Sequence, residues 1–325
     1  MHLMTNWSYE VGNDRGGNPE KVWQSAASDE LRFDHGLFVE YLKELKASGT
    51  NTIILDVGDA LIYDTHPEIA VKGALTPDEM RRELDYMNEM GFEVIPKLNF
   101  SSAHDIWLKD YSRMLSTDIY YKVVSDIIDE VCRIFEPRFF HIGMDEENYE
   151  CQSRYDYAVV RQNDLWWHDL YFYIDCVERN GARAMMWSDA IWIGRDEYLK
   201  RMSKGVLQSN WYYRTDFSEK KLQWNYEFEK RGGWGETVNG AAAFMALEEA
   251  GFDQLPCTSN WADDGSADAV VKYCMANISP DRLKGVYTAS WAKLVPDGEK
   301  KKNIGKVLEG VDLLKGAREK YAAGV

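Results

Sequence analysis

The sequence predicts an α/β fold, and specifically a single (β/α)8 TIM barrel that occupies residues 1–325 as one domain. Short β-type runs alternate with long amphipathic stretches from one end of the chain to the other. Such repeated β–α units, joined by right-handed crossovers, close most economically as an eightfold barrel. A doubly wound open sheet is the alternative, but no G-x-G-x-x-G motif follows the first strand. No linker or break in composition divides the chain.

Eight segments are expected to form strands. The clearest is NTIILDVG at Asn51–Gly58, a continuous apolar run of the kind shown by a parallel strand that is covered on both faces. In chain order the expected strands are Leu3–Trp7, Asn51–Gly58, Phe92–Phe100, Phe139–Met144, Ala182–Trp187, Val206–Trp211, Gln254–Asn260 and Gly285–Ser290.

A helix is expected after each strand. The clearest start is at Thr76, an N-cap residue followed by Pro77 at the first helical position, and Gly91 ends that helix. The Gly/Ala-rich stretch 232–243 is not assigned to an element. The expected helices are Phe38–Gly49, Thr76–Gly91, Thr117–Phe135, Asp164–Asn180, Asp196–Ser203, Ser218–Lys230, Ser266–Ile278 and Asn303–Tyr321.

Charge and composition disfavour some classes of binding partner and favour others. Thirty-eight basic and fifty-four acidic residues give a formal charge of −16, which disfavours nucleic acid and anionic membranes as partners. No apolar stretch is long enough to span a bilayer. An excess of aromatic residues, here twelve Trp and nineteen Tyr, is one mark of sugar-binding enzymes, although large cores also use them. The sequence predicts neither the oligomeric state nor the compartment: residues 1–5 do not resemble a signal peptide, and a leader could have been removed.

The cysteines and histidines do not indicate a metal site. Five widely spaced cysteines contain no C-x-x-C pair, which predicts buried free thiols. His141 lies near Asp145 and Glu146, but neighbours on a strand point to opposite faces, and the spacing matches no zinc motif. We therefore expect neither a metal nor a cofactor.

Active sites of such barrels lie at the carboxyl ends of the strands. Strands five to eight each carry a tryptophan at or near that end, which gives Trp187, Trp211, Trp261 and Trp291. Aromatic walls suit the C–H faces of a pyranose ring, while polar side chains bind its hydroxyl groups. Filling of the barrel rim is the alternative role for any one of these rings. Further candidates for substrate binding at strand ends are Asp189, Tyr213 and Asp263.

The fourth strand ends in the sequence His141-Ile142-Gly143-Met144-Asp145-Glu146. Adjacent carboxylates on extended backbone point in different directions, so Asp145 and Glu146 can take different roles. Crowded acids beside apolar walls raise the pKa of one of them, which supplies a proton donor near neutral pH. The alternative is that these acids only favour the N-terminus of a following helix.

This segment resembles the strand-four motif H-x-G-G-D-E of glycoside hydrolase family 20, the β-N-acetylhexosaminidases. The resemblance extends over residues 51–291, and its specific part is strand four. It implies that Glu146 is the general acid/base that protonates the glycosidic oxygen. It also implies that Asp145 orients the 2-acetamido group of the substrate, whose carbonyl oxygen is the nucleophile.

Other positions are similar to the family more loosely. The family has an Asp and then a His after strand three, where this chain has Asn99 and His104. The aromatic box around the acetamido methyl group is similar to Trp187, Trp211 and Trp291. His141 opens the motif and is a further candidate for substrate binding.

The chain also departs from the family pattern. Strand one lacks the family's sugar-binding Arg, and Met144 replaces the second Gly of the motif. Trp261 stands in place of the Tyr of W-Y-x-D, with Asp263 at the position of its Asp. Lys293 replaces the Glu of W-x-E, and an inward Lys293 would suit a carboxylated or sulfated sugar.

The resulting hypothesis is a retaining exo-β-N-acetylhexosaminidase-like enzyme that acts on an amino sugar or a modified hexose glycoside. Two alternatives stay open. A barrel that binds carbohydrate without catalysis would explain the missing Arg and the altered motifs. A metal-dependent barrel hydrolase is the second, and its activity would be lost with a chelator.

Overall fold

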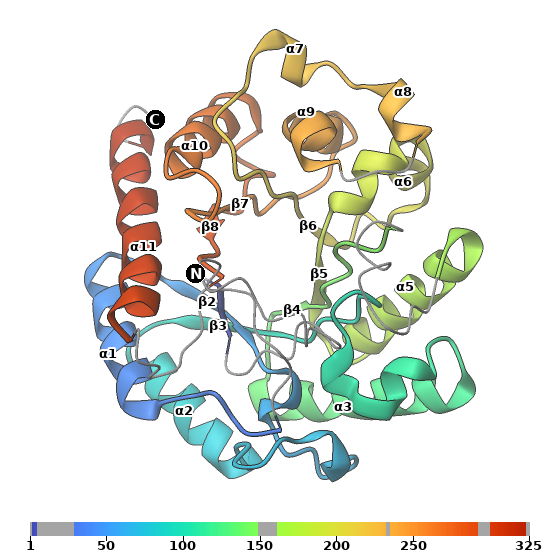
Figure 1. Ribbon diagram of the computed structural model, residues 1–325, viewed down its shortest axis with the longest axis vertical. Coiled ribbons are helices and arrows are strands. Elements are labelled where there is room, and N and C mark those ends of the chain that lie inside the picture. Colours follow the sequence, from blue (N-terminus) through green and yellow to red (C-terminus); the bar gives the residue numbers. More distant parts are fainter. Residues whose placement is uncertain (1, 5–28, 149–160, 232–234, 292–299, 323–325) are drawn as a thin grey trace.

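The computed structural model describes residues 2–4, 29–148, 161–231, 235–291 and 300–322 (Figure 1). The expected alternation of strands and helices is confirmed. The strands and helices in chain order are β1 His2–Met4, α1 His35–Ala47, β2 Thr52–Asp56, α2 Pro77–Glu89, β3 Glu93–Lys97, α3 Asp118–Phe135, β4 Phe139–His141, α5 Asn163–Glu178, β5 Arg183–Trp187, α6 Arg195–Arg201, β6 Leu207–Ser209, α7 Glu219–Leu222, α8 Tyr226–Glu229, α9 Glu236–Glu249, β7 Cys257–Thr258, α10 Ser266–Asn277, β8 Tyr287–Thr288 and α11 Lys300–Ala322.

The strands are parallel and follow one another in space as they do in the sequence. Strands β1 to β6 form one sheet in the order β1-β2-β3-β4-β5-β6, and β7 pairs with β8. Isolated bridges join Gln208 to Gln254 and Trp211 to Cys257, so β7 continues the sheet beyond β6. The pairings among the described residues do not include β8 with β1.

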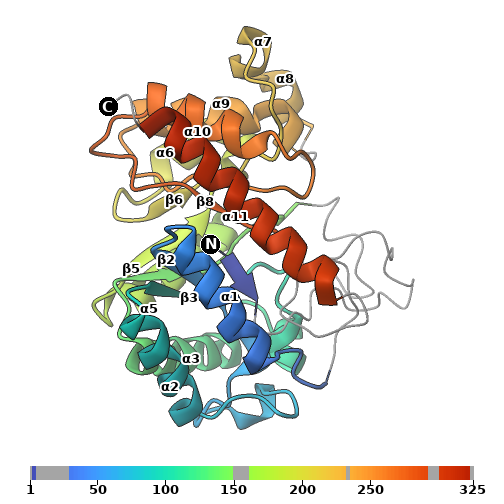
Figure 2. The ribbon, with the colours of Figure 1, turned by 90° about the vertical axis from the view of Figure 1, so that its left-hand side faces the viewer.

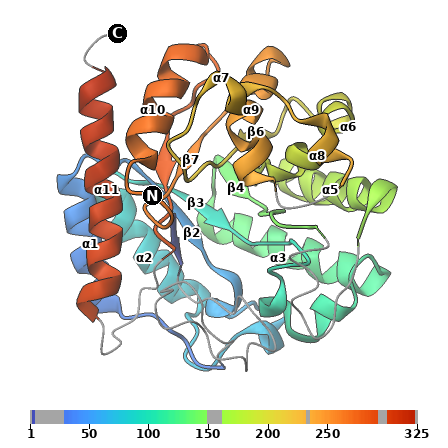
Figure 3. The same ribbon diagram turned by 45° about the horizontal axis from the view of Figure 1, so that its top comes forward.

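The helices lie around the strands in sequence order (Figure 1). Figures 2 and 3 show the last helix, α11, beside the first helix, α1, and these two helices are in contact. The first and last helices therefore lie side by side on one side of the molecule. None of the described helices combines the length and apolar character needed to cross a bilayer.

Burial and capping explain why these segments adopt their structures. The middle of β2, Ile53–Leu55, is buried, as its apolar run predicts. The predicted start of α2 is confirmed by a capping box, in which the Thr76 side chain accepts from the Glu79 N–H and the Glu79 side chain accepts from the Thr76 N–H. Helix α3 begins at the N-cap Thr117, whose side chain accepts from the Tyr120 N–H.

One helix prediction in the later part of the chain is wrong, and one helix was not predicted. The expected helix 218–230 is two short helices, α7 and α8, because Asn225 caps a new helix by accepting from the Phe228 N–H. The unassigned stretch 232–243 contains the start of α9. That helix buries residues on every side, including Glu236 and Asn239, so its sequence shows no amphipathic stripe.

Strands β7 and β8 are shorter than the expected segments 254–260 and 285–290. Pro256 has no N–H to donate to the ladder, which limits regular pairing to the residues after it. The carbonyl of Pro256 still accepts from the Tyr287 N–H at 3.0 Å. Residues at the carboxyl ends of these short strands therefore continue on irregular backbone.

Candidate active site

The backbone after β4 takes an unusual course. The strand ends at His141, not at Met144 as expected, because Gly143, Met144 and Glu146 have φ of 75°, 75° and 60°. A Cβ atom on Gly143 would lie 2.0 Å from Asn99 Oδ1, so glycine is required there by space as well as by φ. Met144 and Glu146 adopt a left-handed conformation that is strained for residues with side chains. This turn fixes where the two acids of the motif lie.

Asp145 is held by polar groups from the segment after β3. Its Oδ1 accepts from Asn99 Nδ2 at 2.7 Å, and its backbone carbonyl accepts from Ser101 Oγ. Burial works to raise the pKa of Asp145, but the positive charges of His104 and Lys97 and the Asn99 amide outweigh it and hold the pKa well below its usual range. Asp145 is therefore an ionised carboxylate at neutral pH.

His104 joins the two acids of the motif. Its Nε2 lies 3.3 Å from Asp145 Oδ2 and 3.4 Å from Glu146 Oε2, and its side chain is almost completely buried. Burial works to lower the pKa of His104, but Asp145 and Glu146 outweigh it and raise the pKa to about 10. A charged imidazolium thus bridges the carboxylates, and Glu146 remains the more exposed of the two.

Asp189 contacts the same turn from β5. It follows Trp187 at the start of a 3-10 helix, η5 (Asp189–Ile193), and its Oδ2 accepts from the Glu146 N–H at 2.9 Å. Burial raises the pKa of Asp189 well above its ordinary value, and the negative charge of Asp145 adds to this. Two carboxyl groups with opposite shifts in pKa therefore flank Glu146.

The floor below this turn is formed by side chains that point inward from the strands. His141 is fully buried, its Nδ1 accepts from the Gly143 N–H at 3.0 Å, and its ring lies 4.9 Å from the Trp187 ring. Lys97 is buried beside Asp56, with 2.5 Å between Nζ and Oδ2, and its ammonium lies 6.0 Å from the Trp187 ring centroid. His141 thus lies beneath the two acids as part of the packed interior.

Aromatic rings cover the ends of the later strands. The Trp187 ring lies 5.8 Å from Tyr287 and 5.9 Å from Trp291. Trp211 stacks on Tyr213 at 4.8 Å, and Tyr213 meets Trp261 edge to face at 6.4 Å. Trp261 is 37% exposed, whereas Trp187 is 1% exposed. The predicted rings therefore run from a buried floor at Trp187 to an exposed rim at Trp261.

Two predicted residues are placed differently from the others. Asp263 lies on the loop after β7, where Oδ1 accepts from the Gly265 N–H at 2.9 Å and Thr215 Oγ1 donates to Oδ2 at 3.4 Å. Its carboxylate thus stabilises its own loop and the neighbouring Thr215. Lys293 lies outside the described residues.

Sequence reasoning missed a second buried charge network next to the motif. Arg161 is fully buried and donates to Glu147 Oε1 at 2.5 Å, to Asp169 Oδ2 at 3.1 Å and to the Phe100 carbonyl at 3.0 Å. Ser101 was also missed. Glu147 could have been suspected because it follows Asp145 and Glu146 directly, but nothing in the local sequence marks Arg161 as buried.

A metal-dependent hydrolase would need several metal-ligating side chains close together. Within the part of the chain that the structure describes, no group of three or more His, Cys, Asp and Glu side chains is arranged to hold a metal ion. Four of the five cysteines are described, namely Cys132, Cys176, Cys257 and Cys274, and each is a buried free thiol, as the sequence predicts.

Solved structures with the same fold are β-N-acetylhexosaminidases of glycoside hydrolase family 20. The enzyme from Streptomyces coelicolor superposes with a TM-score of 0.61 at 14% identity, over 97% of this chain and 63% of that chain. The enzyme from Bacteroides fragilis superposes with a TM-score of 0.60 at 12% identity, over 96% of this chain and 64% of that chain. The exo-β-N-acetylglucosaminidase from Vibrio harveyi superposes with a TM-score of 0.60 at 13% identity, over 96% of this chain and 53% of that chain. The resemblance first seen in strand four is thus confirmed as a likeness of fold.

Sequence comparison finds a more distant likeness. A lacto-N-biosidase from Bifidobacterium bifidum is 21% identical over 199 residues, which is 53% of this chain and 18% of that protein. The chain therefore spans about a fifth of the length of this curated relative and about two thirds or less of the solved structures above. No family model matches the sequence.

Proposed function

We propose that the chain is a glycoside hydrolase of the family 20 type, a retaining exo-β-N-acetylhexosaminidase-like enzyme that uses substrate-assisted catalysis. The observation that carries this proposal is the cluster of Asp145, Glu146 and His104, in which one imidazolium lies 3.3 and 3.4 Å from two carboxylates of different exposure. We further propose that the eight strands close as a (β/α)8 barrel and that residues 1–325 form one catalytic domain.

Glu146 is proposed as the general acid/base. Its side chain is about a fifth exposed, so it reaches both the solvent and the interior of the site. In the first step it donates a proton to the glycosidic oxygen as the C1–O bond breaks. In the second step it takes a proton from the water that attacks C1, which restores the starting protonation state.

Asp145 is proposed to orient the 2-acetamido group. A carboxylate that stays ionised at neutral pH can accept the amide N–H and stabilise the positive charge that develops as the acetamido oxygen attacks C1. The resulting oxazolinium ring is opened by water, so the sugar leaves with retained configuration. Asn99 contacts Oδ1 of Asp145 and His104 contacts its Oδ2, and these contacts hold the carboxylate in place.

Substrate binding is assigned to the aromatic rings and the neighbouring polar groups. Trp187, Trp211 and Trp291 are proposed to enclose the sugar and its acetamido methyl group, with Tyr213 and Trp261 at the rim. The remaining proposed substrate-binding residues are Asn99, His104, Asp189 and Lys293. Of the other two sequence candidates, His141 is fully buried and Asp263 is bonded to its own loop and to Thr215. The reaction as proposed needs no metal or cofactor.

A sugar-binding protein without catalysis is the second candidate. The observations in its favour are in the sequence: strand one lacks the family's sugar-binding Arg, and the motifs after strands seven and eight are altered at Trp261 and Lys293.

Hydrolysis of p-nitrophenyl glycosides tests the proposal. The panel contains N-acetyl-β-glucosaminide, N-acetyl-β-galactosaminide, their non-acetylated and 6-sulfated forms, and β-lacto-N-bioside because of the curated relative. Each reaction is repeated with a chelator. We expect turnover only of sugars with an acetamido group at the cleaved unit, with no effect of the chelator.

The other results separate the candidates. Hydrolysis that stops with the chelator would support the metal-dependent alternative. No hydrolysis across the panel, together with measurable binding of N-acetylglucosamine by calorimetry, would support the sugar-binding protein. Equal turnover of acetylated and non-acetylated sugars would remove the substrate-assisted mechanism.

A further inference from the structure

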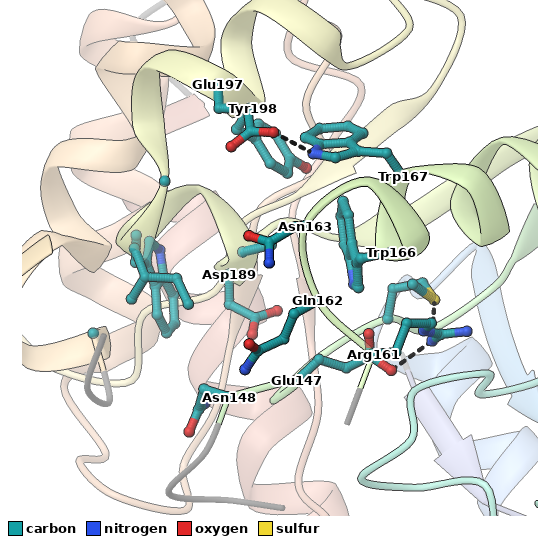
Figure 4. Close-up of a pocket in the computed structure, with 16 residues that line it drawn as sticks. Glu147, Asn148, Arg161, Gln162, Asn163, Trp166, Trp167, Asp189, Glu197 and Tyr198 are labelled. Carbon is teal, nitrogen blue, oxygen red and sulfur yellow. Dashed lines mark hydrogen bonds and ion pairs between the residues drawn. The ribbon is translucent and has the colours of Figure 1, made fainter. Parts of the chain in front are cut away.

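A pocket lies next to the turn that follows β4. It has a volume of about 270 Å³ and is bounded by η5, by the start of α5 and by α6 (Figure 4). We call it the side pocket. Met144 and Glu147 line it from the turn, and Asp189 lies at its inner end, where its other oxygen contacts the Glu146 N–H. The side pocket thus adjoins the site proposed for catalysis and shares Asp189 with it.

Three residues that line the side pocket carry buried polar atoms without a hydrogen-bond partner among the described residues. They are Asp189 Oδ1, Glu147 Oε2 and Arg161 Nε. Asp189 and Arg161 are each more than nine-tenths buried. Because nearly all buried polar atoms in folded proteins have partners, three orphans in one cavity indicate that a polar occupant supplies the missing contacts.

The walls of the side pocket are aromatic. Trp166 and Trp167 meet edge to face at 4.8 Å, and Tyr198 and Trp192 line the pocket from α6 and η5. Figure 4 shows the Trp166 ring facing the cavity above Arg161 and Glu147. Apolar ring faces combined with a few fixed polar atoms suit a ligand that has both C–H faces and hydroxyl groups.

Charge excludes an anionic occupant. The guanidinium of Arg161 is already paired with Glu147 and Asp169, so it offers no uncompensated positive charge. Glu197 adds a further acid to the lining, where its Oε1 accepts from Trp167 Nε1 at 3.0 Å. A carboxylated or sulfated group would therefore meet more negative than positive charge.

We propose that the side pocket is a subsite for one uncharged sugar unit, with Trp166 as a wall and Asp189 and Glu147 as its polar contacts. The choice of a sugar rests on the function proposed above. The volume is below the range of about 300–1,000 Å³ that encloses larger ligands, which limits the occupant to a single ring. That ring is either a second unit of the substrate chain or a free sugar.

Titration calorimetry of the Glu146→Gln protein, which is expected to turn over its ligands about 10²–10⁴ times more slowly, distinguishes these sources. The probes are N-acetylglucosamine, N,N'-diacetylchitobiose, galactose and galacturonate. If the side pocket holds a second unit of the chain, the disaccharide binds about tenfold more tightly than the monosaccharide, a difference of about 1.4 kcal/mol. If it holds a free sugar, N-acetylglucosamine binds with two equivalents. Galacturonate is expected to bind at least about tenfold more weakly than galactose.

Two pocket variants and one control are made in the same background. Trp166→Leu removes a wall and Ala190→Leu reduces the space, whereas Trp224→Leu changes an indole that does not line the pocket. We expect both pocket variants to lose the tighter binding of the disaccharide or, if the occupant is a free sugar, the second equivalent of N-acetylglucosamine. The control should bind as the parent protein does. Circular dichroism melting shows which variants are folded, and either folded pocket variant suffices.

The inference is overturned if N-acetylglucosamine binds with one equivalent and the disaccharide gains nothing over it in the parent protein. It is also overturned if a folded pocket variant keeps the gain. Sugar binding that depends on Trp166 in a protein that hydrolyses no glycoside would keep the inference and reject the proposed hydrolase. Hydrolysis by a protein that shows neither the gain for the disaccharide nor a second equivalent would keep the proposed hydrolase and reject the inference.

Discussion

At the ends of β3, β4 and β5, polar side chains hold one another in place: Asn99 and His104 contact Asp145, and Asp189 contacts the backbone of Glu146. At the ends of β6, β7 and β8, aromatic rings pack against one another, and the carboxylate of Asp263 stabilises its own loop.

This difference separates two requirements of the proposed enzyme. Proton transfer and stabilisation of charge need groups fixed to within fractions of an ångström, and the network of the first region supplies that. Sugar binding by ring faces tolerates changes in side chain, so the second region can differ from the family pattern without loss of chemistry. Substitutions should therefore affect turnover strongly in the first region and weakly in the second.

The largest effect is expected for Glu146→Gln. The amide cannot donate a proton to the leaving group, so kcat on a substrate with a poor leaving group should fall by about 10²–10⁴. The matched control is Glu249→Gln at an exposed position of α9, which should leave kcat unchanged. A Glu146→Gln enzyme that retains most of its activity on such a substrate would show that another group is the acid.

Asp145→Asn is expected to have the next largest effect. Loss of the negative charge should lower kcat/KM for acetamido glycosides by about 10²–10³, as for removal of one preorganised group at a developing charge. Glycosides without the acetamido group should be much less affected. Paired assays of both substrates give the ratio, with the exposed Asp175→Asn as control. Equal losses on the two substrates would contradict the orienting role.

His104→Gln should alter the pH dependence of stability. In the folded protein the pKa of His104 is about 10, above its ordinary value of 6.5, so its charge stabilises the fold fully below pH 6.5 and less and less as the pH rises toward 10. The Tm of the wild type should therefore exceed that of the variant most at pH 5–6, and the gap should narrow by pH 10. A gap that is constant from pH 5 to pH 10 would mean that the imidazolium does not pair with the two acids.

The smallest effect is expected for Asp263→Asn in the second region. An amide oxygen can still accept from the Gly265 N–H, so we expect KM and kcat to stay within about threefold of wild type, in line with the near-neutral effect of most surface changes. A loss of tenfold or more in kcat/KM would show that Asp263 binds substrate, and the contrast between the two regions would then be weaker than described.

Much of the fold and the centre of the site could be predicted from the sequence. Strands such as 51–58 are apolar throughout, and helix starts such as Thr76-Pro77 carry local capping signals. Asp145 and Glu146 were found because they follow a strand directly, and Asn99 and His104 because family 20 has an Asp and then a His after strand three. The structure brings all four together, although their roles in catalysis stay predictions.

The features that were missed depend on contacts between distant segments. Arg161 meets Glu147 and Phe100 only in the folded chain, and a surface arginine would have the same local sequence. Helix α9 was missed because it is buried on every side and so lacks the periodic pattern that marks a helix at the surface. The left-handed turn at Met144 was not expected because methionine gives no signal for positive φ.

The left-handed turn also bears on how this chain can change in evolution. Position 143 admits only glycine, whereas position 144 holds a methionine in a backbone state that glycine adopts freely. Met144→Gly would relieve about 1–2 kcal/mol of backbone strain but would leave a void, because this buried side chain lies against Arg161. Loss of a buried methionine side chain costs about 2–5 kcal/mol, which exceeds the strain that is relieved. Glycine at 144 is therefore an equivalent solution only where a larger neighbour fills the void. Substitutions at 144 are therefore expected to persist in relatives only together with changes around the side pocket.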